Sequence, residues 1–305
     1  LNVISGDLKD KAHDIKMLDS FNIIPASNDI ELAFRRPFDL GDFKDTDIIL
    51  PSIVNGNPVK IFNFENIPNI VKKITIPASV CNIKYLNYYQ SFFDSGKGLE
   101  TIEIDSNNEV YYSDGKAIYS KDKKTLIRFI STSATDYEII DGTEKISKYA
   151  FSYMEKLKKV VVPLSVVVIE DNAFNECNSL ETIEGLDHDI ELNEKIFGTN
   201  KSPFLENKTI LIIGNTILRY WVYDKEVIVI QDGIKKIGQS AFRNFDKKED
   251  SLVEIVLPKS LRIIEANAFS SRKKLKKINI PNGVEEIVSG TFWECEQLEE
   301  VYIPA

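Results

Sequence analysis

The chain has few of the residues on which most catalytic and metal centres depend. Its 305 residues include only two histidines, three cysteines, two methionines and two tryptophans. No Cys-x-x-Cys or His-x-x-x-His spacing occurs, so the sequence offers no zinc motif. His188 lies between two aspartates, but no Gly-x-Ser-x-Gly elbow supplies a nucleophile for a triad. The sequence therefore predicts no enzyme, no metal and no cofactor.

Positive charge and long apolar runs are also missing. Lysine and arginine number 38 against 47 acidic residues, which gives a net charge of −9. Nucleic-acid binding needs a basic face that neutralises phosphates, and a membrane span needs about 20 consecutive apolar residues. We expect neither a nucleic-acid partner nor insertion of this segment into a membrane. The basic run Arg272, Lys273 and Lys274 is interpreted as a solvated turn.

What the chain does contain is a repeat. The phenylalanines of an Ala-Phe pair, once Thr-Phe, recur at steps of 23 or 27 residues within two series, and an isoleucine lies five residues before each. The members are Phe151, Phe174, Phe242, Phe269 and Phe292. Written as one unit, the pattern is L-x-x-I-x-I-P-x-S-V-x-x-I-x-x-x-A-F-x-x-C-x-x, which residues 275–297 show well.

Each part of this unit has a structural meaning. The L-x-x-I-x-I part alternates apolar and polar residues, which is typical of a half-buried strand, and proline then ends the strand. The V-x-x-I-x-x-x-A-F part must carry the chain back over the convex side, in a short helical or irregular turn. Each Phe is expected to stack on the Phe of the next coil. We therefore predict an α/β repeat solenoid, strand-rich, in which coils are stabilised by their neighbours.

The three cysteines fit this repeat rather than a reactive site. Cys177 and Cys295 occupy the same position of the unit, which Met154 and Arg272 hold in other coils. Several coils separate the two, so a disulfide between them is not expected. We predict that these cysteines, like Cys81, are structural thiols.

Two segments break the 23-residue step. Residues 110–130 and 204–220 alternate in polarity and contain the turn pairs Asp114-Gly115 and Gly214-Asn215, so we interpret them as inserted β-hairpins. The repeat pattern begins near residue 48. We predict an N-terminal cap or lead-in over 1–47 and a solenoid over 48–305, and the start at Leu1 suggests a mature or trimmed chain.

Candidate partner-binding residues come from two groups. On alternate positions of the expected strands, Glu254, Lys277 and Glu300 form a row of opposite charges, and Tyr302 belongs to the companion row. Aromatic residues outside the repeat core form the second group, because Tyr and Trp are favoured at interfaces; they are Tyr88, Tyr89, Tyr220 and Trp221. The alternatives are that the rows are a solvated sheet face and that the aromatics pack the insertions onto the solenoid.

The repeat core and the hairpin sequence G-x-x-x-Y-S-K-D-x-x-T-L-I at 115–127 resemble the BspA-type leucine-rich-repeat family. This resemblance implies a leucine-rich-repeat stack that displays a binding face, as in surface and secreted proteins, some of them adhesins. The implied partner is a host or extracellular-matrix protein or another cell-surface protein, and the implied location is extracellular or at the cell surface. A carbohydrate-binding module and an architectural spacer without a ligand are the alternatives.

Overall fold

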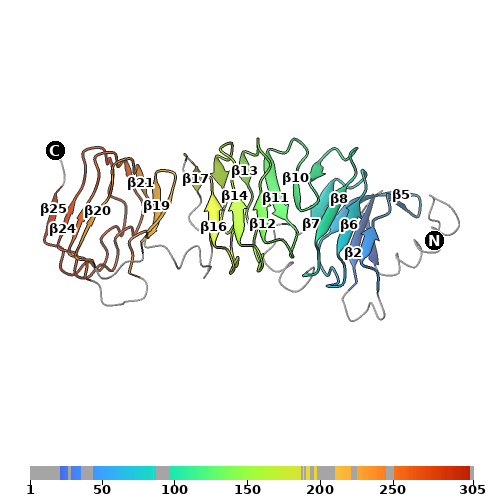
Figure 1. Cartoon of the computed structure of the whole chain (residues 1–305), viewed down its shortest axis with the longest axis horizontal. Helices are drawn as coiled ribbons and strands as arrows, with labels where there is room; N and C mark the ends of the chain where they lie inside the picture. Colours follow the sequence, from blue (N-terminus) through green and yellow to red (C-terminus); the bar gives the residue numbers. More distant parts are fainter. Residues whose placement is uncertain are drawn as a thin grey trace. The chain divides into compact units, whose positions relative to one another are not determined.

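The protein is built from short strands joined by turns (Figure 1). The computed structural model describes residues 21–26, 29–35, 44–84, 86, 97–186, 188, 190–192, 196–197, 210–220, 225–244 and 251–302. The chain divides into two compact units. Unit 1 comprises residues 1–184 and 195–203, and unit 2 comprises residues 185–194 and 204–305.

The strands are short, from two to seven residues, as expected for coils that turn back on themselves. In unit 1 they are β1 (Phe21–Ala26), β2 (Asp29–Phe34), β3 (Asp47–Ile49), β4 (Ile53–Val54), β5 (Asn57–Asn63), β6 (Lys73–Ile76), β7 (Asn82–Lys84), β8 (Thr101–Ile104), β9 (Tyr111–Ser113), β10 (Ala117–Ser120), β11 (Thr125–Phe129), β12 (Asp136–Glu138), β13 (Lys145–Ile146), β14 (Lys159–Val161), β15 (Val168–Ile169) and β16 (Thr182–Glu184). In unit 2 they are β17 (Glu191–Leu192), β18 (Ile210–Ile213), β19 (Thr216–Tyr220), β20 (Val227–Val229), β21 (Lys236–Ile237), β22 (Glu254–Val256), β23 (Ile263–Ile264), β24 (Lys277–Asn279) and β25 (Glu300–Tyr302).

Each well-formed coil contributes two strands to two separate sheets. The L-x-x-I-x-I part forms the first strand, and these pair in parallel in the orders β3-β6-β8, β12-β14-β16 and β20-β22-β24-β25. The V-x-x-I part forms a second, two-residue strand, as in β13 and β15 or β21 and β23. We call the outward side of the first-strand sheets the strand face. Its side chains alternate with buried ones, as the sequence predicts.

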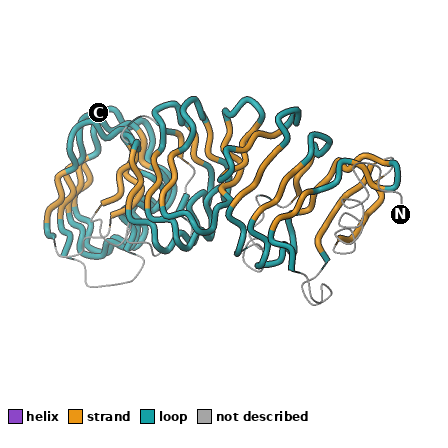
Figure 2. Tube along the Cα trace, turned by 45° about the vertical axis from the view of Figure 1, so that its right-hand side comes forward, coloured by secondary structure: helices purple, strands orange, loops and turns teal. Residues whose placement is uncertain are grey.

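Of the helical or irregular turns expected, the described residues show only the irregular kind, because every element there is a strand or a turn (Figure 2). The α/β class is therefore wrong, and the solenoid is built from strands. The Ala-Phe segment is instead a tight turn flanked by residues with positive φ, two positions before and two after the Phe. They include Tyr149, Tyr153, Asn172, Glu176, Asn267, Ser271, Gly290 and Glu294, with φ between 56° and 74°. A left-handed residue every few positions is incompatible with an α-helix, which explains why the helical expectation is wrong.

The phenylalanines lie over one another, as predicted. In unit 1, the rings of Phe129, Phe151, Phe174 and Phe197 form a column with successive centroids 5.3, 5.0 and 5.8 Å apart. In unit 2, a second column contains Tyr220, Phe242, Phe269 and Phe292, at 5.0, 5.4 and 5.7 Å. The backbone follows the same step, because the amide of Phe151 donates to the Ala173 carbonyl and that of Phe242 to the Ala268 carbonyl. Aromatic contact and hydrogen bonding therefore tie each coil to the next.

Antiparallel strands lie within both segments that break the repeat. In unit 1, β10 pairs antiparallel with β9 and β11, and β11 then pairs in parallel with β13. In unit 2, β18 pairs antiparallel with β19, which pairs in parallel with β21. Both hairpins therefore extend the second-strand sheet. In the described residues the first-strand sheets gain no strand from them, apart from an isolated antiparallel bridge between Ile102 of β8 and Gly115, and they start anew at β12 and at β20.

Upstream, the described residues also form strands. The β1–β2 pair is antiparallel, and β2 joins β5 in parallel, so residues before position 47 share a sheet with the first coils. The division at residue 47 stays a prediction.

Candidate interaction surface

The strand face of unit 2 brings the predicted charged row together. Glu254 pairs in register with Lys277, and Lys277 with Glu300, across adjacent parallel strands. The Lys277 Nζ lies 3.3 Å from the Glu300 Oε2. Lys277 and Glu300 are exposed and Glu254 is half-buried. An exposed pair of this kind contributes little to stability, so these charges are available to a partner at small cost to the fold.

The companion row ends in the aromatic residue predicted for it. Tyr302 pairs with Asn279, and its side chain is 75% exposed. The Asn279 side chain is engaged with the backbone of Leu257, because its amide group accepts from the Leu257 N–H (2.9 Å) and donates to the Leu257 carbonyl (3.2 Å). Tyr302 is thus held on a fixed strand with its ring in solvent, which suits a hydrophobic anchor.

The remaining aromatic candidates do not form a surface in the described residues. Tyr220 is only 5% exposed, and its ring stacks on Phe242 with centroids 5.0 Å apart. It is therefore a core residue and not an exposed anchor. Tyr220 lies 22 residues before Phe242, as Phe129 lies 22 before Phe151, so a comparison of the two hairpins would have revealed this place in the column. Tyr88, Tyr89 and Trp221 lie outside the described residues.

The strand face of unit 1 is also charged. Asp136 pairs with Lys159, and Glu138 with Val161, across β12 and β14. The Lys159 Nζ lies 2.7 Å from the Glu184 Oε1, and this hydrogen bond raises the pKa of Lys159. Lys159 is thus already paired with a carboxylate, whereas the carboxylates of β12 have no ion pair in the described part of the chain.

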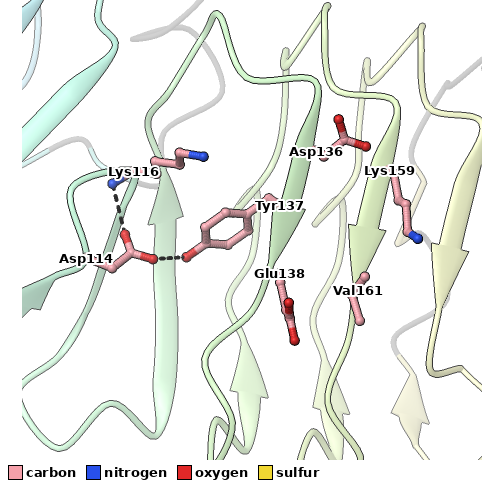
Figure 3. A pocket seen from close by; sticks show the side chains of 7 residues that line it. All are labelled: Asp114, Lys116, Asp136, Tyr137, Glu138, Lys159 and Val161. Carbon is pink, nitrogen blue, oxygen red and sulfur yellow. Dashed lines mark hydrogen bonds between the residues drawn. The ribbon is translucent and has the colours of Figure 1, made fainter.

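A groove with a volume of about 510 Å³ lies between β12 and the loop that precedes β10, and Figure 3 shows its lining. Asp114 on this loop accepts a hydrogen bond from the Tyr137 hydroxyl (2.6 Å) through one carboxylate oxygen. The other oxygen accepts from the amides of Lys116 (2.9 Å) and Ala117 (2.8 Å). Because all these partners are fixed, the Asp114 carboxylate holds the loop against the end of the Tyr137 ring.

The Tyr137 hydroxyl belongs to a chain of buried hydroxyl groups. The Tyr119 and Tyr137 hydroxyls lie 2.5 Å apart, and the Ile140 amide donates to the Tyr119 hydroxyl (3.4 Å). Burial raises the pKa of both tyrosines well above their usual range, so both stay protonated. With Asp114 as the final acceptor, the Tyr137 hydroxyl donates to Asp114 and the Tyr119 hydroxyl donates to Tyr137.

Cys177 and Cys295 take the structural role predicted for them, whereas Cys81 is exposed and its role stays a prediction. None of the three is in a disulfide. The Cys177 thiol donates to the Phe151 carbonyl (2.9 Å), and the Cys295 thiol donates to the Phe269 carbonyl (3.2 Å). Burial raises the pKa of Cys177 to about 12, which makes this thiol a poor nucleophile.

Arg272 is not in a solvated turn as expected. It is fully buried, and its Nε donates to the Phe242 carbonyl, so it does in its coil what cysteine does in the others. Lys273 and Lys274 are exposed. Arg272 shares its repeat position with Cys177 and Cys295, and that position indicates burial correctly. Its charge indicates exposure, which is wrong.

Two further buried polar residues were not anticipated. Arg128 is 1% exposed and donates to the Tyr149 carbonyl, the Ser152 hydroxyl (2.8 Å) and the Ser152 carbonyl (3.1 Å). Asn108 is fully buried, donates to the Val80 carbonyl (2.7 Å) and accepts from the amide of Tyr111 (2.8 Å). Both side chains satisfy backbone groups near the first hairpin by hydrogen bonds.

The described residues contain no group of three or more His, Cys, Asp or Glu side chains arranged to hold a metal ion. Nor do they include a helix with the length and hydropathy needed to cross a bilayer.

Comparison with solved structures finds other leucine-rich-repeat proteins. A leucine-rich repeat protein from Eubacterium ventriosum is 18% identical, with a TM-score of 0.46 and 94% of each chain covered. A leucine rich cell surface protein from Faecalibacterium prausnitzii is 20% identical, with a TM-score of 0.37 and coverage of 93% of this chain and 87% of that one. The pneumococcal vaccine antigen PcpA is 19% identical, with a TM-score of 0.37; the alignment covers 81% of this chain and 49% of PcpA, so this chain spans about half of that length.

Among curated proteins none matches significantly. The profile of the BspA type leucine rich repeat region, in contrast, matches six copies over residues 125–246 and 212–305. This profile describes a repeat region and not a catalytic domain. Because it covers more than half of the chain and the phenylalanine columns lie within it, the protein belongs to the BspA-type leucine-rich-repeat family.

Proposed function

We propose that the protein is a non-enzymatic, adhesin-like binding module of the cell surface or of a secreted protein. The partner would be a host or extracellular-matrix protein, or another cell-surface protein. It would bind on the strand face of unit 2, through Glu254, Lys277, Glu300 and Tyr302.

One observation carries this proposal: side chains of alternating charge stand in register on adjacent parallel strands. Glu254, Lys277 and Glu300 come from β22, β24 and β25, so their backbones are fixed by the ladder and by the core beneath it. A ligand would meet charges that are already positioned, and complementary charge mainly gives specificity and a fast association rate. Tyr302 beside this row adds the apolar contact that an interface centre needs.

A carbohydrate ligand is less well supported. Sugar binding to an open face generally uses an aromatic platform. In the first strands that the structure describes, Tyr302 is the one exposed aromatic side chain. A spacer role would leave this face without a ligand, and the experiment below distinguishes both alternatives.

The experiment measures binding of the purified chain to a panel of immobilised extracellular-matrix proteins and to a glycan array. The Glu254→Lys/Lys277→Glu double variant exchanges the two charges of the face and keeps the net charge. The matched control is Lys273→Glu/Glu296→Lys, which exchanges an exposed pair 2.6 Å apart outside the first strands. We expect a protein ligand whose affinity falls about tenfold or more in the face variant and changes less than about twofold in the control.

Three outcomes would contradict the proposal. Equal losses in both variants would show that the face is not the binding surface. Binding to glycans alone would favour the carbohydrate module. Binding to neither array would favour the spacer.

A further inference from the structure

The first strand after the hairpin of unit 1, β12, has a ladder on one side only. Its partner is β14, and in the described residues no strand pairs with its other edge. The hairpin between β8 and β12 adds its strands to the second-strand sheet and leaves the first-strand sheet interrupted at this point.

The hydrogen bonds define which backbone groups face the open edge. The Thr135 carbonyl accepts from Lys159, and the Ile139 amide donates to Val161, so these odd-numbered residues face β14. In a strand, successive residues direct their amide and carbonyl groups to opposite edges. The amide and carbonyl groups of Asp136 and Glu138 therefore face the open edge. Ile140, the next even-numbered residue, follows the same rule, because its amide donates to the Tyr119 hydroxyl on the hairpin.

The groove keeps this edge accessible. The Asp114 loop contacts β12 through the hydroxyl of Tyr137 and not through its backbone, so the length of the tyrosine ring separates loop and strand edge (Figure 3). Asp136 and Glu138 line the same groove and are exposed. A strand edge with unpaired amides is a ready template for another strand.

The charges of the groove indicate what such a strand would carry. The Thr135 hydroxyl donates to the Asp136 Oδ2 (2.6 Å), and Asp136 and Glu138 both lie close enough to Lys159 to raise its pKa, but in the described residues neither carboxylate forms an ion pair within 4 Å. The Lys159 amine is paired with Glu184, and the Asp114 carboxylate already accepts hydrogen bonds from three donors. Lys116 is the remaining cation among the lining residues. Elsewhere on the strand faces, lysines meet the carboxylates of a neighbouring strand, as Lys73 does with Glu103 at 2.7 Å.

We propose that the open edge of β12 binds an extended, lysine- or arginine-rich segment of a partner protein by strand addition. The backbone of the segment pairs with Asp136 and Glu138. Residues directly opposite these two lie on the same face of the sheet, so basic side chains at alternate positions meet both carboxylates. This surface is separate from the charged row of unit 2, and either one can fail without the other.

The second hairpin supplies an internal comparison. Val227 and Val229 of β20 follow it as Asp136 and Glu138 follow the first, each 91 residues further along the chain. Both valines are exposed, at 48% and 68%. The position is thus acidic in unit 1 and apolar in unit 2, which limits the preference for basic segments to β12.

The test uses a peptide of about eight alternating threonine and lysine residues, long enough to form a strand. A second peptide of the same sequence and charge is N-methylated at every backbone amide, so it cannot donate a backbone hydrogen bond to the open edge in either strand orientation. Fluorescence anisotropy measures their binding to the full chain. We expect the unmodified peptide to bind at least about tenfold more tightly than the N-methylated one, and hydrogen exchange of the Glu138 amide to slow when it binds.

Variants separate charge from backbone pairing. Asp136→Asn/Glu138→Gln should weaken binding about tenfold, while Glu100→Gln/Glu181→Gln, which removes the same charge from outside the groove, should change it by less than about twofold. Glu138→Pro removes an amide of the open edge and keeps the ladder to β14, so it should weaken binding further than Glu138→Gln.

Equal binding of the two peptides would overturn the proposal, since it would mean that only net charge attracts them. It would also be overturned if the groove and control variants had equal effects, or if Glu138→Pro matched Glu138→Gln while remaining folded by thermal denaturation. These results leave the proposed function of the unit 2 face untouched.

Discussion

The rings of Phe151 and Phe174 lie face to face, with centroids 5.0 Å apart and planes inclined by 6°. Both side chains are fully buried. Truncating Phe174 removes its own burial and leaves a cavity beside the rings of Phe151 and Phe197. We expect Phe174→Ala, and its counterpart Phe269→Ala in unit 2, to lower the free energy of unfolding by about 3–5 kcal/mol, measured by denaturant titration.

The matched control for these variants is Trp293→Ala. Trp293 follows Phe292 directly but is 61% exposed, so its truncation should cost less than about 1 kcal/mol. Similar losses for Trp293→Ala and Phe269→Ala would contradict the role of the column.

Arg128 offers a second test, because its guanidinium binds backbone groups of the following coil. Burial lowers its pKa, yet the group stays charged at neutral pH. Arg128→Met fills a similar space but leaves the Ser152 and Tyr149 carbonyls without this donor, so we expect a loss of about 1.5–3 kcal/mol in unfolding titrations. The exposed Lys156→Met should be nearly neutral; a comparable loss there would show that removal of charge alone is responsible.

The reactivity of the thiols toward an alkylating reagent should follow their exposure. Cys81 is exposed, whereas Cys177 is fully buried and its pKa of about 12 leaves almost no thiolate at about pH 8. Because the pKa is raised, an increase in pH toward 12 is needed before the thiolate forms. We expect iodoacetamide to label Cys81 in the native protein and Cys177 only in denaturant, as read by mass spectrometry of peptides. Rapid native labelling of Cys177 would contradict its burial.

At the left-handed positions beside the Ala-Phe pairs, two substitutions should change the stability of the protein in opposite directions. Ser240 has a φ of 58°, so Ser240→Gly relieves about 1–2 kcal/mol of backbone strain in the folded protein. The glycine also raises the entropy of the unfolded chain, which costs about 0.4–1 kcal/mol of stability. The net gain in stability should be about 0.5–1 kcal/mol. Gly290 has a φ of 74° at the equivalent position two residues before Phe292, and a Cβ there would lie 2.4 Å from the Asn267 Oδ1. Backbone strain and this clash should exceed the gain from the smaller unfolded-state entropy, so Gly290→Ala should cost about 1–2 kcal/mol. Changes of the same sign in thermal denaturation would contradict this account.

The repeat spacing was sufficient to predict the coils, the strand face and the aromatic columns. These follow from apolar residues at fixed steps, and hydrophobic burial depends on just that pattern. The free, structural cysteines were predictable for the same reason, since Cys177 and Cys295 share one position of the unit. The charged row of Glu254, Lys277 and Glu300 followed from strand alternation.

What the sequence did not predict depends on individual backbone conformations and on contacts across insertions. Tyr149 and Glu176 have positive φ although neither residue type favours it, so the sequence could not decide between a helical and an irregular turn. Arg272 was assigned to solvent because of its charge. The contact between Asp114 and Tyr137 joins a hairpin loop to a strand 23 residues later, and no periodicity encodes it.

The carbonyls of three repeat phenylalanines each meet a side chain of the coil that follows: Cys177 for Phe151, Arg272 for Phe242 and Cys295 for Phe269. The coil of Phe269 thus brings a donor, Arg272, for its predecessor and a carbonyl for its successor. A genetic duplication or deletion of one whole coil would carry both halves with it and leave no orphaned polar group in the interior. The length of the stack can therefore change during evolution in whole coils, whereas the loss of part of a coil would break the pairing.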